Sequence, residues 1–366
     1  MKKKVGIVTI NDYSNYGNRL QNYALQEFLK TFNCEVNTIT NIPEKKDLNV
    51  KIANMKLAFS KLNKELYYKI KKKRILKENK ELLASKINNF KRFTNTFIDE
   101  KDFRELTKDN LNDYSYFITG SDQVWNPYFR KGNANDFLTF APKEKRLSYA
   151  PSFGVSKIPK YYEKLYKKWL LGFEDISVRE SSGKDLIKFI ADKNSTVLLD
   201  PTLMLEKNEW KKIFNNKIIS NSEKIILTYF LGDIPLKAKK QLNDLCEHEN
   251  FKIINIASFE DKENYDLDPA EFLQLIESSS LFLTDSFHGV VFSIIFDTPF
   301  IVFNREDSSP AMNSRIDNLL SKLLLENRKF ESVKNDEVFN SDYNQAKKII
   351  EKEKQLSIKY LKERMK

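Results

Sequence analysis

The sequence predicts an α/β protein with two doubly wound, Rossmann-like domains facing a central cleft. Short apolar runs typical of buried parallel strands alternate with segments of helical periodicity in both halves. The length of 366 residues exceeds what one compact core of ordinary size holds. The polar, Asn-rich stretch Trp210–Glu223 separates the halves. We therefore expect domains at residues 1–215 and 216–330, followed by a charged helix at 331–366.

The first half begins with a strand, a polar loop and a helix. Val5–Thr9 is apolar, Asn11–Asn18 is polar with one glycine, and Arg19–Thr31 has a broad apolar face. Amides at such a helix start can bind an anion. The loop is not GxGxxG, and the sequence holds no GxxxxGK[ST], so nothing supports a nicotinamide or P-loop site. Further strands are expected at Val36–Thr40, Tyr114–Thr119, Arg146–Ala150, Ile176–Val178 and Thr196–Leu199.

Residues 45–110 are predicted to form a basic helical insertion. Lys51–Arg92 holds 14 Lys or Arg and 3 Asp or Glu, so this segment accounts for the whole net charge of +11. One apolar stripe runs along it, formed by Ile52, Met55, Phe59, Leu62 and Leu66. The stripe either docks the protein on anionic lipid or a phosphorylated acceptor, or packs on the core while the lysines face water. The packed alternative is the more common arrangement.

The second half contains a βαβ unit at Leu281–Phe303. Its predicted parts are the strand Leu281–Thr284, the polar loop Asp285–Gly289, the helix Val290–Phe296 and the strand Phe300–Phe303. Ligands in open α/β sheets bind at the carboxyl ends of the strands, where His288 lies. The sequence has two histidines, and we interpret the other, His248, as structural at the end of a helix. Other elements expected here are the strands Ile225–Leu231 and Phe251–Ile256, the helices Ile234–Glu249 and Glu271–Ser278, and a helix headed by Ser314-Arg315-Ile316.

Two polar sites in the first half follow strand ends. Gly120-Ser121-Asp122 presents amides, a hydroxyl and a carboxylate, although an ordinary Asx turn is the simpler interpretation. Arg179 follows Ile176–Val178 and is either a phosphate or carboxylate ligand or a salt-bridge partner of Glu180. Arg179 and His288 would face each other across the cleft, an arrangement that suits a small anionic donor and an acid/base group.

Several function classes lack support in the sequence. Cys34 and Cys246 match no metal or redox spacing, and two free thiols are typical of a reducing cytoplasm. No run of 18 apolar residues predicts a membrane span. There is no GxSxG motif, and His and Cys are too few for a zinc site.

Six segments, in this order, resemble the polysaccharide pyruvyl transferase family: Asn15–Leu25, Gly120–Asn126, Ser148–Gly154, Val178–Glu180, Asp200–Thr202 and Thr284–Gly289. The resemblance implies a fold similar to GT-B glycosyltransferases and transfer of a pyruvyl group from phosphoenolpyruvate to a sugar of a cell-surface glycan precursor, as a ketal. The family's essential Arg and His fall on Arg179 and His288. Looser substrate-binding candidates are Asn15, Gly17, Ser121, Asp122, Asp285, Ser286 and Arg315.

The resemblance implies no cofactor or metal beyond phosphoenolpyruvate as co-substrate, and a nucleotide- or lipid-linked saccharide as acceptor. His288 would act as acid or as base. We expect a cytoplasmic protein that can touch the inner membrane face through residues 51–92. A GT-B glycosyltransferase using a nucleotide sugar is the alternative enzyme. A basic membrane-surface or nucleic-acid-binding protein is a third hypothesis, and sparse aromatics in the basic segment argue against nucleic acid.

Overall fold

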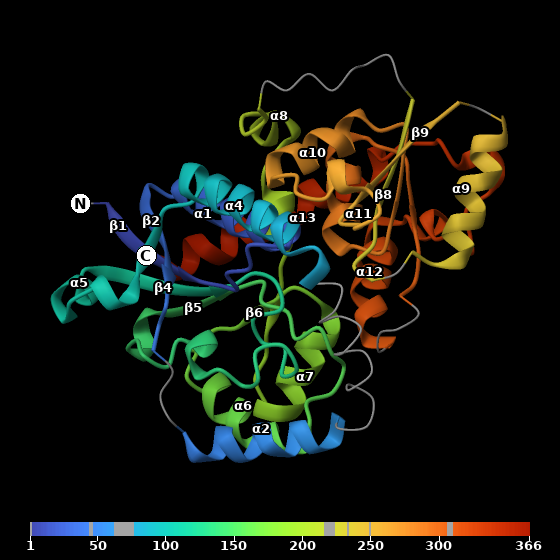
Figure 1. Ribbon diagram of the computed structural model, residues 1–366. Coiled ribbons are helices and arrows are strands. Elements are labelled where there is room, and N and C mark those ends of the chain that lie inside the picture. The colour runs from blue at the N-terminus through green and yellow to red at the C-terminus, as the bar shows by residue number, and fades with distance from the viewer. Residues whose placement is uncertain are drawn as a thin grey trace.

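The chain forms two parallel sheets with helices on their faces, and a small third sheet (Figure 1). The computed structural model describes residues 2–43, 47–61, 77–215, 224–232, 234–248, 250–305 and 310–366. The first sheet has the order β3 (Glu100–Asp102), β2 (Cys34–Thr40), β1 (Lys3–Val8), β4 (Tyr114–Gly120), β5 (Arg146–Tyr149). The second has the order β11 (Phe300–Val302), β10 (Leu281–Thr284), β8 (Ile225–Tyr229), β9 (Lys252–Ile256). The third pairs β6 (Ser177–Val178) with β7 (Thr196–Val197).

Helices connect the strands and cover both faces of each large sheet. In the first half they are α1 (Tyr16–Lys30), α2 (Leu48–Lys61), α4 (Lys80–Phe97), α5 (Lys108–Asn112), α6 (Lys160–Leu170), α7 (Ser181–Ala191) and α8 (Lys207–Lys211). In the second half they are α9 (Leu236–His248), α10 (Pro269–Ser278), α11 (Phe287–Phe296), α12 (Pro310–Leu323) and α13 (Asn344–Arg364).

Strand direction confirms the predicted fold class of two doubly wound, Rossmann-like domains. Every strand pair within the described residues is parallel. Parallel strands need helical crossovers, which the alternating sequence supplies. Among the described helices, none has an apolar stretch of the length that a transmembrane segment requires.

The two halves are in direct contact. The ring of Tyr16 from α1 stacks on Phe272 from α10, with centroids 4.4 Å apart. The last helix, α13, joins both halves: Tyr343, just before it, donates to the Thr298 carbonyl in the second half. Beyond its other end, the carbonyl of Lys366 accepts from Tyr116 in the first sheet. The chain therefore returns to its starting domain (Figure 1).

Three predicted helix starts are wrong by three or four residues. Helix α1 begins at Tyr16 rather than Arg19, because the side chain of Asn15 caps it by accepting from the Asn18 amide at 3.1 Å. Helix α11 begins at Phe287 rather than Val290, because Ser286 caps it in the same way. His288 therefore lies in a helical turn and not in a loop. Helix α12 begins at Pro310, so Arg315 lies in its second turn. Strand β3 was not predicted.

The apolar stripe of the basic insertion does not pack on the core where it is described. Ile52 and Met55 are 37% and 55% exposed, while Ala53 and Leu57 are buried. The packed alternative is therefore wrong for these two residues. Outside the described residues lie two positions of the stripe, Leu62 and Leu66, and the side chain of Phe59. Residues 216–223 of the predicted domain boundary lie outside them as well.

Candidate active site

Arg179, directly after β6, is buried among three carboxylates. Its Nη1 donates to Oδ2 of Asp200 at 2.8 Å. Its Nη2 lies 3.6 Å from Oδ1 of Asp122, and its Nε lies 3.6 Å from Oε2 of Glu180. The Phe287 ring covers the guanidinium at 4.5 Å. Within the described structure, Nε and Nη2 have no hydrogen-bond partner. The ion-paired alternative is therefore confirmed, with Asp200 as the closest partner rather than Glu180, while two donors of Arg179 remain unused.

Asp200 lies at the centre of the cluster. Its Oδ2 accepts from Oγ of Ser121 at 3.1 Å and lies 3.6 Å from Nε2 of His288. Burial alone raises the pKa of Asp200, but the charges of His288 and Arg179 outweigh burial and hold that pKa well below its usual range. Sequence reasoning missed this residue as a site residue. The signal was present, because Asp200 directly follows the predicted strand Thr196–Leu199.

His288 approaches Asp200 from the other half. It lies in the first turn of α11, is 7% exposed, and its Nε2 has no hydrogen-bond partner among the described residues. Its Nδ1 faces the first turn of α1 so closely that a Cβ on Gly17 would lie 2.1 Å away. A glycine at 17 is therefore required for the two helix starts to meet. Gly17 acts here as a contact surface for the imidazole.

Two other candidates of the first half, Ser121 and Asp122, lie beside the Asp200–Arg179 pair. The amide of Ser121 donates to Oε1 of Gln21 at 3.0 Å, and Oδ2 of Asp122 accepts from Asn18 at 3.4 Å. The backbone at Gly120 has φ of 125°, and a Cβ there would lie 2.1 Å from the Tyr149 carbonyl oxygen. The turn is therefore fixed by sterics, and it directs Asp122 toward Arg179. Asn15 and Ser286 both serve as helix caps.

The second half adds two more arginines. With its amide oxygen turned toward α12, Gln123 accepts from Nη1 and Nη2 of Arg315 at 3.1 and 3.2 Å. Burial, followed by the charge of Arg179, lowers the pKa of Arg315 to about 10. Arg305 was not predicted, and its Nε donates to Oδ2 of Asp285 at 3.0 Å. Burial raises the pKa of Asp285, although Arg305 opposes this effect.

This cluster has the properties of an anion site. Buried donors normally have partners, yet Nε and Nη2 of Arg179 and Nε of Arg315 have none in the described structure. Guanidinium groups bind carboxylates and phosphates in a planar, bidentate way. Within the described residues, no group of His, Cys, Asp and Glu is arranged to hold a metal ion.

A family model decides the relationship of the chain. The model for polysaccharide pyruvyl transferase matches residues 15–308, well over half of the 366 residues. The chain belongs to this family. All the residues of the cluster except Arg315 lie within the matched range. No protein of curated function matches the sequence.

Solved structures resemble the chain only distantly. They include a putative UDP-N-acetylglucosamine 2-epimerase from Listeria monocytogenes, with 10% identity, a TM-score of 0.47, and coverage of 100% of this chain and 90% of that one. S. aureus MnaA with UDP has 12% identity, a TM-score of 0.47, and coverage of 96% and 88%. The glycosyltransferase SnogD from Streptomyces nogalater has 8% identity, a TM-score of 0.43, and coverage of 100% of both chains. At these scores the likenesses carry no argument about function.

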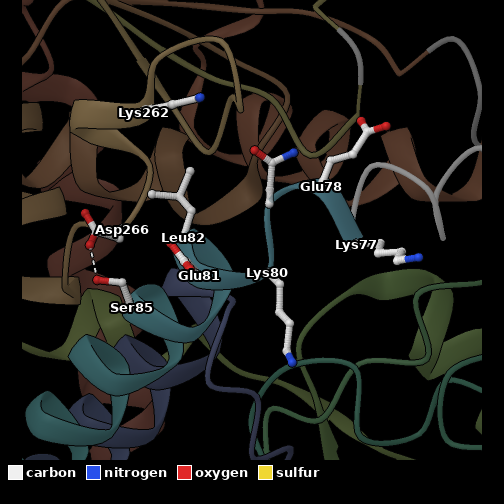
Figure 2. Close-up of a pocket in the computed structure, with 9 residues that line it drawn as sticks. Lys77, Glu78, Lys80, Glu81, Leu82, Ser85, Lys262 and Asp266 are labelled. Carbon is white, nitrogen blue, oxygen red and sulfur yellow. Dashed lines mark hydrogen bonds between the residues drawn. The ribbon is translucent and has the colours of Figure 1, made fainter.

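A separate cavity of about 750 Å³ opens between α4 and the segment 262–266 (Figure 2). Ser85 and Asp266 are hydrogen-bonded at its edge, and Lys77, Lys80, Glu81 and Lys262 are among its lining residues. Next to Ser85, the Nζ of Lys86 lies 4.8 Å from the ring centroids of both Tyr16 and Tyr265. Burial lowers the pKa of Lys86 to about 8. The Tyr16 ring that Lys86 contacts belongs to the residue next to Gly17, which in turn contacts His288.

Proposed function

We propose that this family member transfers the pyruvyl group of phosphoenolpyruvate to two hydroxyls of a sugar in a cell-surface polysaccharide or glycoconjugate precursor. The product is a cyclic ketal, and inorganic phosphate is released. One observation carries the proposal: Arg179 from the first half and His288 from the second converge on the buried carboxylate of Asp200. A cation with unused donors and an imidazole from the other half thus lie on either side of one carboxylate.

The unused donors match the charge of phosphoenolpyruvate, which carries a phosphate and a carboxylate. Arg179 offers Nε and Nη2, and Arg315 offers Nε. Asp122 and Glu180 lie 3.6 Å from Arg179, which is beyond hydrogen-bond distance. The Nε and Nη2 donors of Arg179 therefore remain available to ligand oxygens. We assign the phosphate to Arg179 and the carboxylate to Arg315. Asp200, which also accepts from Ser121, holds Arg179 in place while it binds.

The chemistry requires one proton to be added and two to be removed. A proton reaches C3 of the enol, and C2 becomes oxocarbenium-like. The first sugar hydroxyl bonds to C2 and loses its proton, the C2–O bond to phosphate breaks, and the second hydroxyl closes the ring and loses its proton. His288 supplies the C3 proton through Nε2, and this nitrogen faces the ionised Asp200. One hydroxyl proton restores His288, and the other leaves with phosphate.

The acceptor in this proposal is a nucleotide- or lipid-linked saccharide, and the reaction needs no metal or cofactor. The cavity between α4 and residues 262–266 is lined mainly by polar and charged side chains, among them Lys80, Ser85 and Asp266. Such a lining is suited to sugar hydroxyls. The reaction belongs in the cytoplasm, where phosphoenolpyruvate is made.

The test is phosphate release from phosphoenolpyruvate in the presence of UDP-linked and polyprenyl-diphosphate-linked saccharides, with the pyruvylated product identified by mass spectrometry. Arg315→Leu should raise KM for phosphoenolpyruvate about tenfold or more, because one charge-assisted contact is lost. The alternative is a glycosyltransferase. Thermal stabilisation by a UDP- or CMP-sugar, with none by phosphoenolpyruvate and no phosphate release, would overturn the proposal in favour of that alternative.

A further inference from the structure

Helix α2 carries an apolar line on its outer face. Leu48, Ile52 and Met55 are 69%, 37% and 55% exposed. With about 100° of rotation per residue, these three side chains fall within about 60° of one another. Ala53 and Leu57, which are buried, lie on the opposite side of the same helix. Figure 1 shows α2 at the outer edge of the first half, with α6 between it and the sheet. The apolar line therefore points away from the protein.

Lysines border this line on both sides. By the same rotation, Lys51 lies on one flank of the line and Lys56 on the other. Both are exposed, and no ion pair with either is formed among the described residues. The helix, written LNVKIANMKLAFSK, contains three lysines and no acidic residue. A lysine at each border of an apolar line can extend its ammonium to lipid headgroups while the stem follows the apolar surface.

The helix beneath reinforces this charge. Helix α6 packs against α2, and Tyr162 of α6 is hydrogen-bonded to Asn54 of α2. Four of the eleven residues of α6 are exposed lysines, against one acidic residue. Lys51 and Lys56 therefore border the apolar line directly, and the neighbouring helix adds further exposed lysines to this side of the molecule. Positive charge around an apolar line is complementary to an anionic bilayer surface, whose headgroups attract lysines within about a Debye length.

We propose that α2 is a peripheral membrane-docking helix, which inserts Leu48, Ile52 and Met55 at an anionic bilayer surface with Lys51 and Lys56 at the headgroups. The structure motivates this assignment because the line is exposed although its helix is firmly packed through the opposite face. Three short side chains and a few lysines give reversible rather than permanent binding. The proposal is independent of the catalytic one, because none of these residues belongs to the Arg179–His288 cluster.

The experiment is flotation of the full-length protein with vesicles of phosphatidylcholine alone or with about one third phosphatidylglycerol. We expect the protein to float only with the anionic vesicles, and less so as salt rises. The triple variant Leu48→Ser, Ile52→Ser, Met55→Ser should reduce the bound fraction about tenfold, and Lys51→Glu with Lys56→Glu should do the same at low salt. The matched control is Leu236→Ser on α9, which removes a leucine that is 81% exposed and should float normally.

Thermal unfolding of each variant checks that it is folded, since all the changed side chains are exposed. The proposal is overturned if the folded triple variant floats like the unchanged protein, or if the unchanged protein binds neutral vesicles equally well or binds neither kind. It is also overturned if the unchanged protein is a dimer in solution that the triple variant dissociates, because a second copy would then cover this face. Phosphate release with a soluble acceptor should be unaffected by the triple variant.

Discussion

The two halves bring opposite charge to the place where they meet. On the first half, Arg179 is surrounded by the carboxylates of Asp122, Glu180 and Asp200. On the second half, Arg305 and Arg315 accompany His288, with Asp285 as a nearby carboxylate already bonded to Arg305. Carboxylates therefore outnumber arginines in the part of the site from the first half. Arginines outnumber carboxylates in the part from the second half.

This difference indicates how the two halves are joined at the site. Asp200 is shared between Arg179 of its own half and His288 of the other, so the carboxylate joins the halves. An incoming anion adds negative charge where Arg315 still has an unused donor. Burial, followed by repulsion from Arg179, lowers the pKa of Arg315, so a bound anion would also offset the repulsion between the two arginines.

The largest effect should come from removing the imidazole of His288. His288→Gln keeps an amide of similar size but cannot transfer a proton, so phosphate release from phosphoenolpyruvate should fall about 10²- to 10⁴-fold. The measurement is kcat in the phosphate-release assay, together with thermal unfolding to show that the fold is intact. His248→Gln, which changes the other histidine, at the end of α9, is the control and should keep full activity. Full turnover by His288→Gln would contradict the assigned role.

Removing the shared anion should have the next largest effect. Asp200→Asn leaves Arg179 without its closest carboxylate, so stability should fall by about 3 kcal/mol and kcat by about tenfold or more. Because the folded pKa of Asp200 is lowered, its stabilising charge is present above the unfolded pKa of about 3.9 and is lost only at still lower pH. The difference in stability between variant and parent should thus be constant from pH 5 to pH 8, which urea unfolding would measure.

The control for that variant is Asp185→Asn, at an exposed position of α7, which should leave stability within about 0.5 kcal/mol of the parent. A stability difference for Asp200→Asn that disappears near pH 6 would show that Asp200 is not ionised as argued.

A bulkier residue between the halves should separate them. Gly17→Ala places a methyl group 2.1 Å from Nδ1 of His288, so His288 must move even though alanine favours a helix. We expect a loss of about 1–3 kcal/mol and a reduced kcat with little change in KM for phosphoenolpyruvate. The matched variant is Gly183→Ala in α7, where the nearest atom, on Phe153, is 3.3 Å away and the cost should be small. Equal behaviour of the two variants would show that the contact with His288 does not matter.

The smallest effect concerns Lys86, whose ammonium is buried beside aromatic rings at the same junction. Its pKa is lowered from the usual 10.5 to about 8, so the folded state binds fewer protons between these values and stability rises with pH there. Lys86→Met should therefore stabilise the protein by about 1–3 kcal/mol at pH 7. The loss of the cation–π contacts reduces this gain, and the gain should disappear by pH 10. Unfolding at pH 7 and pH 10 measures this, with the exposed Lys80→Met as control. A gain that persists at pH 10 would argue against a buried charge.

The sequence by itself predicted the fold class, the described strands except β3, and that Arg179 and His288 come together from the two halves. Apolar runs and helical periodicity are local signals, and parallel strands bring their carboxyl ends to one edge. The predicted helix starts were less accurate. The capping side chains of Asn15 and Ser286 place the starts of α1 and α11 three residues earlier than predicted.

Only the tertiary structure decided which groups are joined by a hydrogen bond or an ion pair. Asp200, Arg305 and Gln123 join the site because segments far apart in the chain are packed together, and no local pattern encodes that packing. The same holds for Gly17 against His288 and for the outward face of Ile52 and Met55. Periodicity shows that a helix has an apolar stripe, whereas the neighbouring elements determine which side of that helix is covered.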